Sequence, residues 1–461
     1  MSTNSVGEKS NTKESVKHPV GLYLVSFTIM WERFSYYGMR ALLILFLTTQ
    51  LIKGGLGLDT KSAGLIYGNF TGLVYLTPLL GGWLADKYLG QRKAVVWGST
   101  LIALGQFALF TTHTKSMLYL GLLLLILGNG FFKPNMSSLV GQLYEKDDSR
   151  KDSAYSIFYM AINVGAFIAP LICGTLAEQI FAQKQGAEII SYGYRYGFLA
   201  AGIGMLIGQI AFMLLSNKYM KGIGKHPITK ASTTDTKDSN KPLTKQEKNR
   251  IKAIFIMVFF VTFFWAGFEQ AGASLTIYTK DFINRNMGSF VVPTSWFQSL
   301  NPIFCVILGP TMGALWVYLS KREKGDLTIP QKMSLGMILL GIGFLLMVGA
   351  VLQRGSAGDD VTVKANMMWL VGAYFLHTVG EMCLSPVGLS MVSKLSPPKY
   401  VSLLMGVWLF SSAIANKLAG VVASLMGTFT HMQIFGTIAG VSIVLGFMLL
   451  SLNKKLISMM Q

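Results

Sequence analysis

Twelve apolar segments, each long enough to cross a bilayer as a helix, divide almost the entire chain. A helix spans the hydrocarbon core with about 20 predominantly apolar residues. Polar or charged residues separate the segments, which lie at 20–48, 62–85, 94–112, 117–143, 153–178, 193–216, 251–279, 295–320, 333–352, 366–393, 400–426 and 433–452. Only 13% of the 461 residues are charged, whereas soluble domains carry about 25%. The sequence therefore predicts an all-α membrane protein with twelve transmembrane helices.

The basic residues predict the orientation of these segments. With the N-terminus inside, and with Arg195 and Lys252 at the span ends counted with the adjoining loops, 27 lysines and arginines fall in inside segments, against 9 outside and 4 within the spans. Cytoplasmic loops carry such an excess, so both termini are expected in the cytoplasm and the protein in the cell membrane. The net charge of +19 is then a topology signal and an attraction to anionic lipid headgroups. We expect the lipid bilayer, and no nucleic acid, as a partner.

One long polar segment divides the chain into two halves. We expect a cytoplasmic tail at 1–19, a six-helix bundle at 20–216, a linker at 217–250, a second six-helix bundle at 251–452, and a tail at 453–461. The loop after the second span has a faint echo in the loop after the eighth. Two pseudo-symmetric six-helix bundles with a site between them characterise the major facilitator fold.

The loop after the second span also matches the facilitator pattern Gly-x-x-x-Asp-x-x-x-Gly-x-Arg-Lys. The matching residues are Gly82, Asp86, Gly90, Arg92 and Lys93. We expect the acid and the basic residues to hold helices together on the cytoplasmic side. The alternative is a simple charged turn.

Three charges interrupt the first span. Each of Glu32, Arg33 and Arg40 would cost roughly 2.5–3.5 kcal/mol in hydrocarbon, so such residues usually face a watered cavity or a counter-ion. On a helix of about 100° per residue, Arg33, Tyr36 and Arg40 share a narrow face, with Glu32 and Tyr37 at its edges. Guanidinium groups and phenols suit a ligand with a carboxylate and carbonyls. The alternative is a structural Glu32–Arg33 pair.

Three further charges lie inside other spans, and their depths make two complementary pairs. Arg40 and Glu269 fall in the outer half, whereas Lys133 and Glu381 lie toward the middle or the inner half. Each pair joins one residue of each bundle, which suggests an outer and an inner gate that form alternately. A carboxylate freed from its cation takes up a proton more readily, a route to proton coupling. The alternative is two static bridges.

The other polar residues of the spans do not suggest an enzyme or a metal centre. Cys173, Cys305 and Cys383 have no paired spacing, so we expect neither a disulfide nor a metal site. A membrane enzyme would need a clustered nucleophile and base, so no enzyme activity and no cofactor are expected. Opposed gates also disfavour a channel. Lys417 can snorkel outward, and His377 is expected to pack between helices.

Several motifs, in order along the chain, resemble those of one family. They are Trp-Glu-Arg-Phe-Ser-Tyr-Tyr-Gly at 31–38, the loop at 82–93, Phe-Phe-Lys-Pro-Asn at 131–135, Phe-Tyr-Met-Ala-Ile-Asn-Val-Gly at 158–165, Ser-Leu-Asn-Pro at 299–302 and Gly-Glu-Met-Cys-Leu-Ser-Pro at 380–386. The chain thereby resembles the proton-dependent oligopeptide transporters, the POT/PTR branch of the major facilitators. The resemblance implies import of di- and tripeptides by symport with protons. We expect the protein to act as a monomer.

The resemblance also implies roles for individual residues. The family's basic residues that meet the peptide carboxylate and the coupling machinery are matched here by Arg33, Arg40 and Lys133. The family's contacts for the peptide amino terminus are matched by Asn163 and Glu381, with Asn301 and Ser385 nearby. The residues that line the family's side-chain pockets are matched by Tyr36, Tyr37, Tyr75, Trp265 and Trp408. Without the family, Asn163 and the tryptophans would be packing residues or interfacial anchors.

The sequence departs from the family pattern at two places. The family usually has a second glutamate three residues before Glu32, and here that residue is Ile29. Many bacterial members also carry two additional helices between the halves, which the polar linker cannot form. Two alternatives to a peptide symporter therefore stay open: a carrier of the same fold for another zwitterion or anion, such as an amino-acid derivative or nitrate, and a uniporter.

Overall fold

The computed structural model describes residues 17–145, 148–185, 188–227, 243–323, 325–355, 358, 360–397 and 400–460. Residues 1–16 of the predicted tail and 228–242 of the predicted linker lie outside the described residues. The described chain is mostly helical, with three short two-stranded sheets. It has the all-α architecture that the apolar segments predict.

Fourteen labelled α-helices account for most of the described chain. The first half contains α1 (Val20–Thr48), α2 (Thr60–Leu84), α3 (Gln91–Phe110), α4 (Lys115–Gln142), α5 (Lys151–Thr175) and α6 (Tyr194–Tyr219). The second half contains α7 (Lys245–Phe268), α8 (Ser274–Phe282), α9 (Leu300–Ser320), α10 (Ile329–Gln353), α11 (Met367–Leu395), α12 (Val401–Ser424), α13 (His431–Ser451) and α14 (Asn453–Met460).

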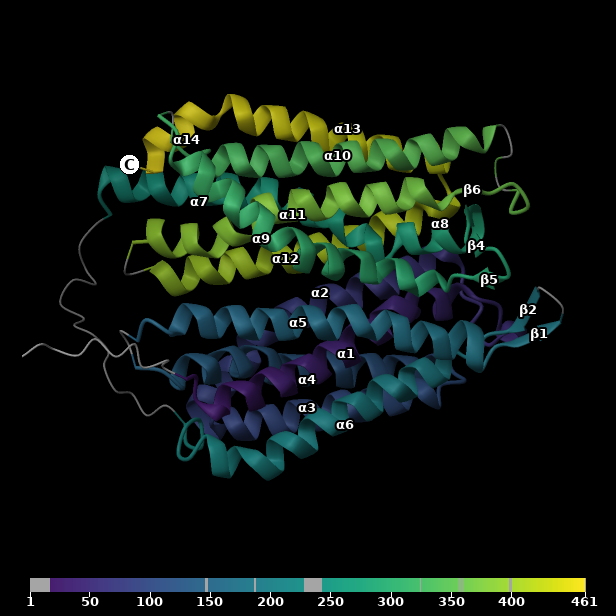
Figure 1. Ribbon diagram of the computed structural model, residues 1–461, viewed down its shortest axis with the longest axis horizontal. Coiled ribbons are helices and arrows are strands. Elements are labelled where there is room, and N and C mark those ends of the chain that lie inside the picture. The colour runs from purple at the N-terminus through teal and green to yellow at the C-terminus, as the bar shows by residue number, and fades with distance from the viewer. Residues whose placement is uncertain are drawn as a thin grey trace, which may run out of the picture.

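The strands are short and join loops at one end of the molecule. Antiparallel pairs form between β1 (Gln183–Gln185) and β2 (Glu188–Ser191), and between β4 (Asn286–Met287) and β5 (Phe290–Val291). A parallel pair forms between β3 (Ile283–Asn284) and β6 (Ala365–Asn366). We call this end of the molecule the hairpin end, and the opposite end, where α1 begins and α13 ends, the terminal end (Figure 1).

Eleven of the described helical segments are long and apolar enough to cross a membrane. They overlap every predicted span except the first, which α1 occupies. The three charges of α1, Glu32, Arg33 and Arg40, are buried inside the protein and therefore do not face lipid. The chain is a multi-pass membrane protein.

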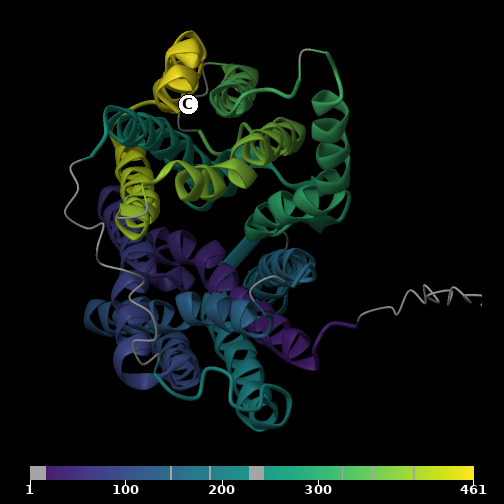
Figure 2. The same ribbon diagram turned by 90° about the vertical axis from the view of Figure 1, so that its left-hand side faces the viewer.

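Two helix sets lie one above the other, with α1–α6 in one set and α7–α14 in the other (Figures 1 and 2). Within the first set α1 packs on α5 and α6, and α3 packs on α4; within the second set α10 packs on α11 and α13. Between the sets, α2 packs on α12, and α5 packs on α9. This arrangement agrees with the major facilitator fold that the sequence predicts.

The start of α7 differs from its prediction. The polar residues before Ile251 suggested a start at 251, but the helix begins at Lys245. Thr244 and Glu247 form a capping box, in which the Thr244 hydroxyl accepts from the Glu247 backbone N–H at 3.2 Å. Because this box satisfies free backbone donors, the helix extends into the polar segment.

The predicted span 251–279 is not one continuous helix. α7 ends at Phe268, a 3₁₀ turn covers Glu269–Gly272, and α8 follows. At Gly272, a β-carbon would clash with the Tyr67 hydroxyl oxygen and lie 3.0 Å from both Nε and Nη2 of Arg40, so the lack of a side chain lets this backbone pack against the first helix set. The break thus lies at a contact between the two helix sets.

Hydrogen bonds close the hairpin end between the two sets. The buried carboxylate of Glu178, just beyond α5, accepts from the Thr294 backbone N–H at 2.8 Å and from Arg285 Nη1 at 3.2 Å. Trp296 Nε1 donates to the Leu171 carbonyl at 3.0 Å. These bonds tie the end of α5 to the loop before α9.

A seam of small residues brings α2 and α12 together toward the hairpin end. A β-carbon at Gly64 would lie 2.8 Å from the Gly420 carbonyl oxygen, and one at Gly68 would lie 2.7 Å from the Gly420 Cα. Lys417 of α12 also donates from its exposed amine to the side chain of Asn69 on α2. The two helices therefore meet backbone to backbone along this seam.

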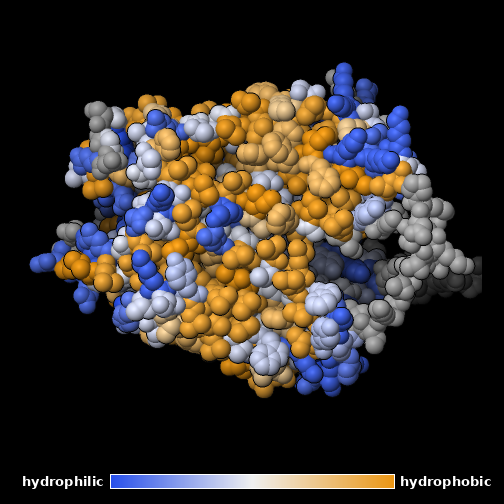
Figure 3. Space-filling view, turned by 180° about the vertical axis from the view of Figure 1, so that it is seen from behind, coloured by the Kyte–Doolittle hydropathy of each residue, from blue (hydrophilic) through white to orange (hydrophobic). Residues whose placement is uncertain are grey.

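The surface is hollowed between the two sets at the terminal end, whereas hydrophobic residues cover most of the middle of the molecule (Figure 3). The hydrogen bonds and the seam described above lie toward the opposite end. The structure is thus closed between the sets at the hairpin end and open at the terminal end.

In the facilitator-like loop after α2, a basic residue holds separate segments together as predicted, whereas the acidic residue does not. Arg92 donates from Nε to the Ile223 carbonyl at 2.6 Å and from Nη2 to the Lys221 carbonyl at 2.5 Å. This side chain ties the start of α3 to the segment after α6. Asp86 accepts from Gln91 Nε2 at 2.8 Å, which is a contact within the loop itself.

Candidate functional site

A cavity of about 150 Å³ lies between the two helix sets and is lined by both. Five of the predicted site residues line it: Tyr37, Arg40, Asn163, Asn301 and Glu381. The other polar lining residues are Tyr159, Gln298, Tyr374, His377 and Thr378. The first set contributes a guanidinium and the second a carboxylate, so the cavity has walls of opposite charge.

Glu381 is held by neutral groups. Its Oε2 accepts from Asn301 Nδ2 at 2.8 Å and from the Cys305 thiol at 3.7 Å, both on α9. Asn301 also donates to the Thr378 hydroxyl at 3.1 Å. Among the described residues, no cation forms an ion pair with Glu381. Its carboxylate is therefore oriented by α9 but is not neutralised.

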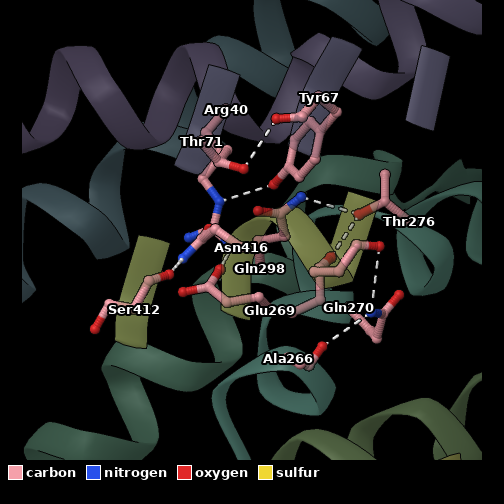
Figure 4. A network of polar contacts seen from close by, with 12 residues as sticks. Arg40, Tyr67, Thr71, Ala266, Glu269, Gln270, Thr276, Gln298, Ser412 and Asn416 are labelled. Carbon is pink, nitrogen blue, oxygen red and sulfur yellow. Dashed lines mark hydrogen bonds and ion pairs between the residues drawn. The ribbon is translucent and has the colours of Figure 1, made fainter. Parts of the chain in front are cut away.

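Arg40 joins the two helix sets through polar contacts with Tyr67 and Glu269 (Figure 4). Its Nε donates to the Tyr67 hydroxyl at 2.9 Å, and its Nη2 forms an ion pair with Glu269. Both charged side chains are buried. The Arg40–Glu269 contact predicted from the sequence is present in the structure.

Arg33 contacts the carboxylate next to it in the chain. Its Nε and Nη2 donate to the two oxygens of Glu32 at 2.5 and 2.6 Å, a bidentate pair. The guanidinium also lies 5.3 Å from the ring centroid of buried Tyr36. The pair proposed as the structural alternative therefore exists, and neither charged residue is among those that line the cavity.

Lys133 does not contact Glu381 in this structure. Its Nζ lies 4.1 Å from the ring centroid of Tyr75, a cation–π contact. The described residues thus contain the predicted outer ion pair and lack the predicted inner one. This combination matches a molecule that is open at the terminal end.

Nine of the predicted site residues lie outside the lining of this cavity: Glu32, Arg33, Tyr36, Tyr75, Lys133, Trp265, Glu269, Ser385 and Trp408. Trp265 is half-buried, with its ring centroid 5.3 Å from that of Phe268. Trp408 is buried against the backbone of Gly388. Ser385 is exposed. The side chains of Trp265, Trp408 and Ser385 are therefore not part of the cavity lining that contains Glu381.

A family comparison agrees with this architecture. The model of the POT family matches residues 92–237 and 228–439, which include the helices that carry Lys133, Asn163 and Glu381. The chain belongs to the POT family.

Relatives of this POT family member extend over nearly its whole length. It is 37% identical over 95% of its length to an uncharacterized transporter, YclF, of Bacillus subtilis (strain 168), of which it covers 94%. A crystal structure of a peptide transporter, POT, in complex with alafosfalin has a TM-score of 0.85 at 33% identity, with 96% of each chain covered. A POT family transporter in complex with 5-aminolevulinic acid has a TM-score of 0.85 at 27% identity, covering 96% of this chain and 98% of the other.

The residue that replaces the usual glutamate of the POT family is buried in this protein. Ile29 is 2% exposed and lies one helical turn before Arg33 in α1. No carboxylate is therefore available to Arg33 from that turn, and Glu32 accepts hydrogen bonds from two of its three guanidinium nitrogens, Nε and Nη2.

Sequence reasoning missed several residues around the cavity of the POT family member. Tyr159 precedes Asn163 by four residues, Thr378 precedes Glu381 by three, and Cys305 follows Asn301 by four. Such spacings place side chains on the same helix face. A search one turn before and after each predicted residue would have found them. Gln298 likewise precedes Asn301 by three residues, whereas Tyr67 offered no comparable signal.

Proposed function

We propose that this protein is a secondary active transporter that imports di- and tripeptides with protons through alternating access. The observation that carries the proposal is the cavity between the two helix sets, with an unpaired carboxylate on one wall and a guanidinium on the other. A peptide is a zwitterion, so it needs one acidic and one basic wall. Membership of the family and the similarity to a peptide transporter support the proposal.

The cavity suggests which end of a peptide meets which wall. Glu381, with Asn163 and Asn301, suits the peptide ammonium because these groups supply a charge and hydrogen-bond acceptors. The basic residues of the first set suit the peptide carboxylate. The proposed set for the carboxylate and the coupling machinery is Arg33, Arg40 and Lys133, with Glu32 and Glu269. The proposed set for the peptide side chains is Tyr36, Tyr37, Tyr75, Trp265 and Trp408, with Ser385 near the amino terminus.

The Arg40–Glu269 pair and the predicted Lys133–Glu381 pair together suggest a gating mechanism. In the present arrangement Arg40–Glu269 closes the hairpin end, and Lys133 and Glu381 stand apart. We infer that the terminal end faces the cytoplasm, that both termini lie there, and that the protein acts as a monomer in the cell membrane. Rocking of the segments 20–216 and 251–452 about the cavity would form the Lys133–Glu381 pair and release Glu269.

Proton coupling follows from the release of a carboxylate. Glu269 loses its cation when the hairpin end opens, and a carboxylate without a cation accepts a proton more readily. Because Ile29 replaces the usual glutamate, the coupled proton would bind to the carboxylate of Glu269 or Glu381. Neutralising the carboxylate before closure would avoid burial of a single unpaired charge.

Reconstituted vesicles provide the direct test of the function. Labelled dialanine is expected to accumulate when the proton gradient points inward and to equilibrate without accumulation when the gradient is collapsed. Excess unlabelled trialanine should compete, because the same two charged walls bind any short peptide. Uptake that ignores the gradient would show a uniporter, which contradicts the symport mechanism.

A second candidate function is a carrier for an amino-acid derivative, which the similarity to a transporter in complex with 5-aminolevulinic acid favours. The same vesicles separate the two candidates. Competition by 5-aminolevulinic acid with no competition by dialanine or trialanine would favour the second candidate and overturn the first. Competition by peptides retains the first candidate.

Substitution of Glu381 by glutamine is expected to weaken dialanine uptake about 30-fold, since a hydrogen bond to a charged group contributes about 2 kcal/mol. N-acetyl-dialanine, which lacks the ammonium, isolates the cause. It should be transported poorly by the original protein, and the variant should weaken it no further. If the variant reduced both substrates equally, Glu381 would not be the ammonium contact.

A further inference from the structure

A groove at the terminal end lies apart from the central cavity, on the outside of the second helix set. It runs between the first turns of α7 and the short helix α14, and its volume is about 570 Å³. Its lining consists of Asn249, Lys252, Phe255, Ile256, Lys455 and Met459. None of these residues takes part in the proposed transport of a peptide.

The groove is positively charged, because its described lining contains two lysines and no aspartate or glutamate. Lys252 and Lys455 are exposed, and neither forms an ion pair with any described residue. No aspartate or glutamate follows Glu381 in the chain, so α14 carries no acidic residue. The carboxylate of Glu247, at the start of α7, accepts from Thr244 in the capping box. The two ammonium groups therefore lack an anionic partner within the groove.

Apolar surface continues from the lysines toward the middle of the membrane. Phe255 is 51% exposed and Phe259, one turn further along α7, is 49% exposed. Both rings lie on a helix that is apolar enough to span the bilayer, so their exposed faces contact lipid chains. The groove thus joins a basic region at the terminal end to an apolar surface deeper in the membrane.

Contacts between α14 and α7 hold the shape of the groove. Leu456 of α14 is 1% exposed, and Arg250 Nε donates to the Met460 carbonyl at 3.1 Å. These contacts fix the helix against α7 while Lys455 stays exposed. The two lysines are therefore presented together by packed helices and not by a loose tail.

We propose that this groove binds an anionic phospholipid from the leaflet at the terminal end. The headgroup phosphate lies between Lys252 and Lys455, Asn249 donates to a headgroup oxygen, and an acyl chain follows Phe255 and Met459. Clusters of basic residues next to membrane helices attract anionic lipids, and the apolar side of the groove suits a lipid chain better than a free phosphate. Phosphatidylcholine satisfies the site less well because its choline repels the lysines.

Native mass spectrometry of the detergent-purified full chain tests the proposal. With equal amounts of phosphatidylglycerol and phosphatidylcholine, the protein is expected to retain the anionic lipid about 10-fold more, because two lysines near a headgroup each favour it several-fold. The double variant Lys252→Gln/Lys455→Gln should lose this preference. Lys454→Gln is the matched control, since this neighbouring exposed lysine of α14 is not part of the lining, and it should keep the preference.

The midpoint of thermal unfolding gives a second measurement, which does not require the lipid to stay bound in the mass spectrometer. Phosphatidylglycerol should raise the midpoint of the original protein and of Lys454→Gln more than that of the double variant. Equal retention of both lipids by the original protein, or an unchanged preference in the double variant, would overturn the proposal. A rise of the same size with inorganic phosphate would also overturn it, because the acyl chain would then contribute nothing.

Discussion

Reversing one charge of the Arg40–Glu269 pair is expected to lower dialanine uptake about 1,000-fold, because a buried charge that faces a like charge costs about 4 kcal/mol or more. The single variants are Arg40→Glu and Glu269→Arg. Both side chains are buried and lie between the two helix sets, so water cannot compensate for the lost partner. Uptake into vesicles under an inward proton gradient measures the effect.

The doubly reversed variant decides whether the pair acts as a gate contact. It restores opposite charges at the same place, so uptake should recover at least 10-fold over either single variant. Full recovery is not expected, because the Tyr67 hydroxyl accepts a hydrogen bond from Arg40 and would have to donate one to a glutamate at position 40. Lys417→Gln is the control: this exposed lysine also joins the two sets, through Asn69, and its loss should change uptake little. A double variant no better than the singles would contradict the gate.

A leucine in place of Gly420 is expected to reduce uptake about 100-fold by preventing closure of the hairpin end. The α2–α12 seam leaves no room for a side chain, since a β-carbon at Gly420 would meet the Gly64 and Gly68 backbone. Overpacking of this kind costs about 3 kcal/mol of the closed arrangement, so the population shifts about 100-fold toward the open one. Thiol labelling of a Ser424→Cys variant from the outer side should become faster when leucine is present.

Two comparisons make the seam experiment specific. Gly68→Leu, on the facing helix, should reproduce both the loss of uptake and the faster labelling. Gly436→Leu on α13 is the matched control, because no atom lies within 4 Å of a β-carbon there. The explanation fails if Gly420→Leu transports normally, or if Gly436→Leu is impaired to the same degree.

Much of the fold could be predicted from the sequence because membrane spans follow from local composition. Each apolar segment must be helical to satisfy its own backbone in lipid, so counting segments yields the architecture without tertiary information. The break at Glu269–Gly272 could not be predicted in this way. Its last residue, Gly272, packs against Tyr67 and Arg40 from the other half of the chain, and the local sequence does not reveal that contact.

The candidate site was predicted in part for a similar reason. Charges in apolar spans are rare, so Arg40, Asn163 and Glu381 could be proposed from sequence and family motif, and they line one cavity. The partners that hold them are ordinary residues such as Cys305 and Thr378, which carry no such signal. The position of Lys133 beside Tyr75 depends on which end of the molecule is open, and a sequence does not specify one state.

The break between α7 and α8 also bears on how the hairpin end opens. Five residues, the turn Glu269–Gly272 and Ala273, join the long helix to the nine-residue helix beyond it, and hinges are commonly a few such residues at the ends of elements. We therefore expect this joint to act as a hinge, with the short helix moving once the Arg40–Glu269 pair and the Lys280–Thr49 hydrogen bond have both broken. Admission of a small solute would then begin with a local motion, before either bundle turns as a rigid body.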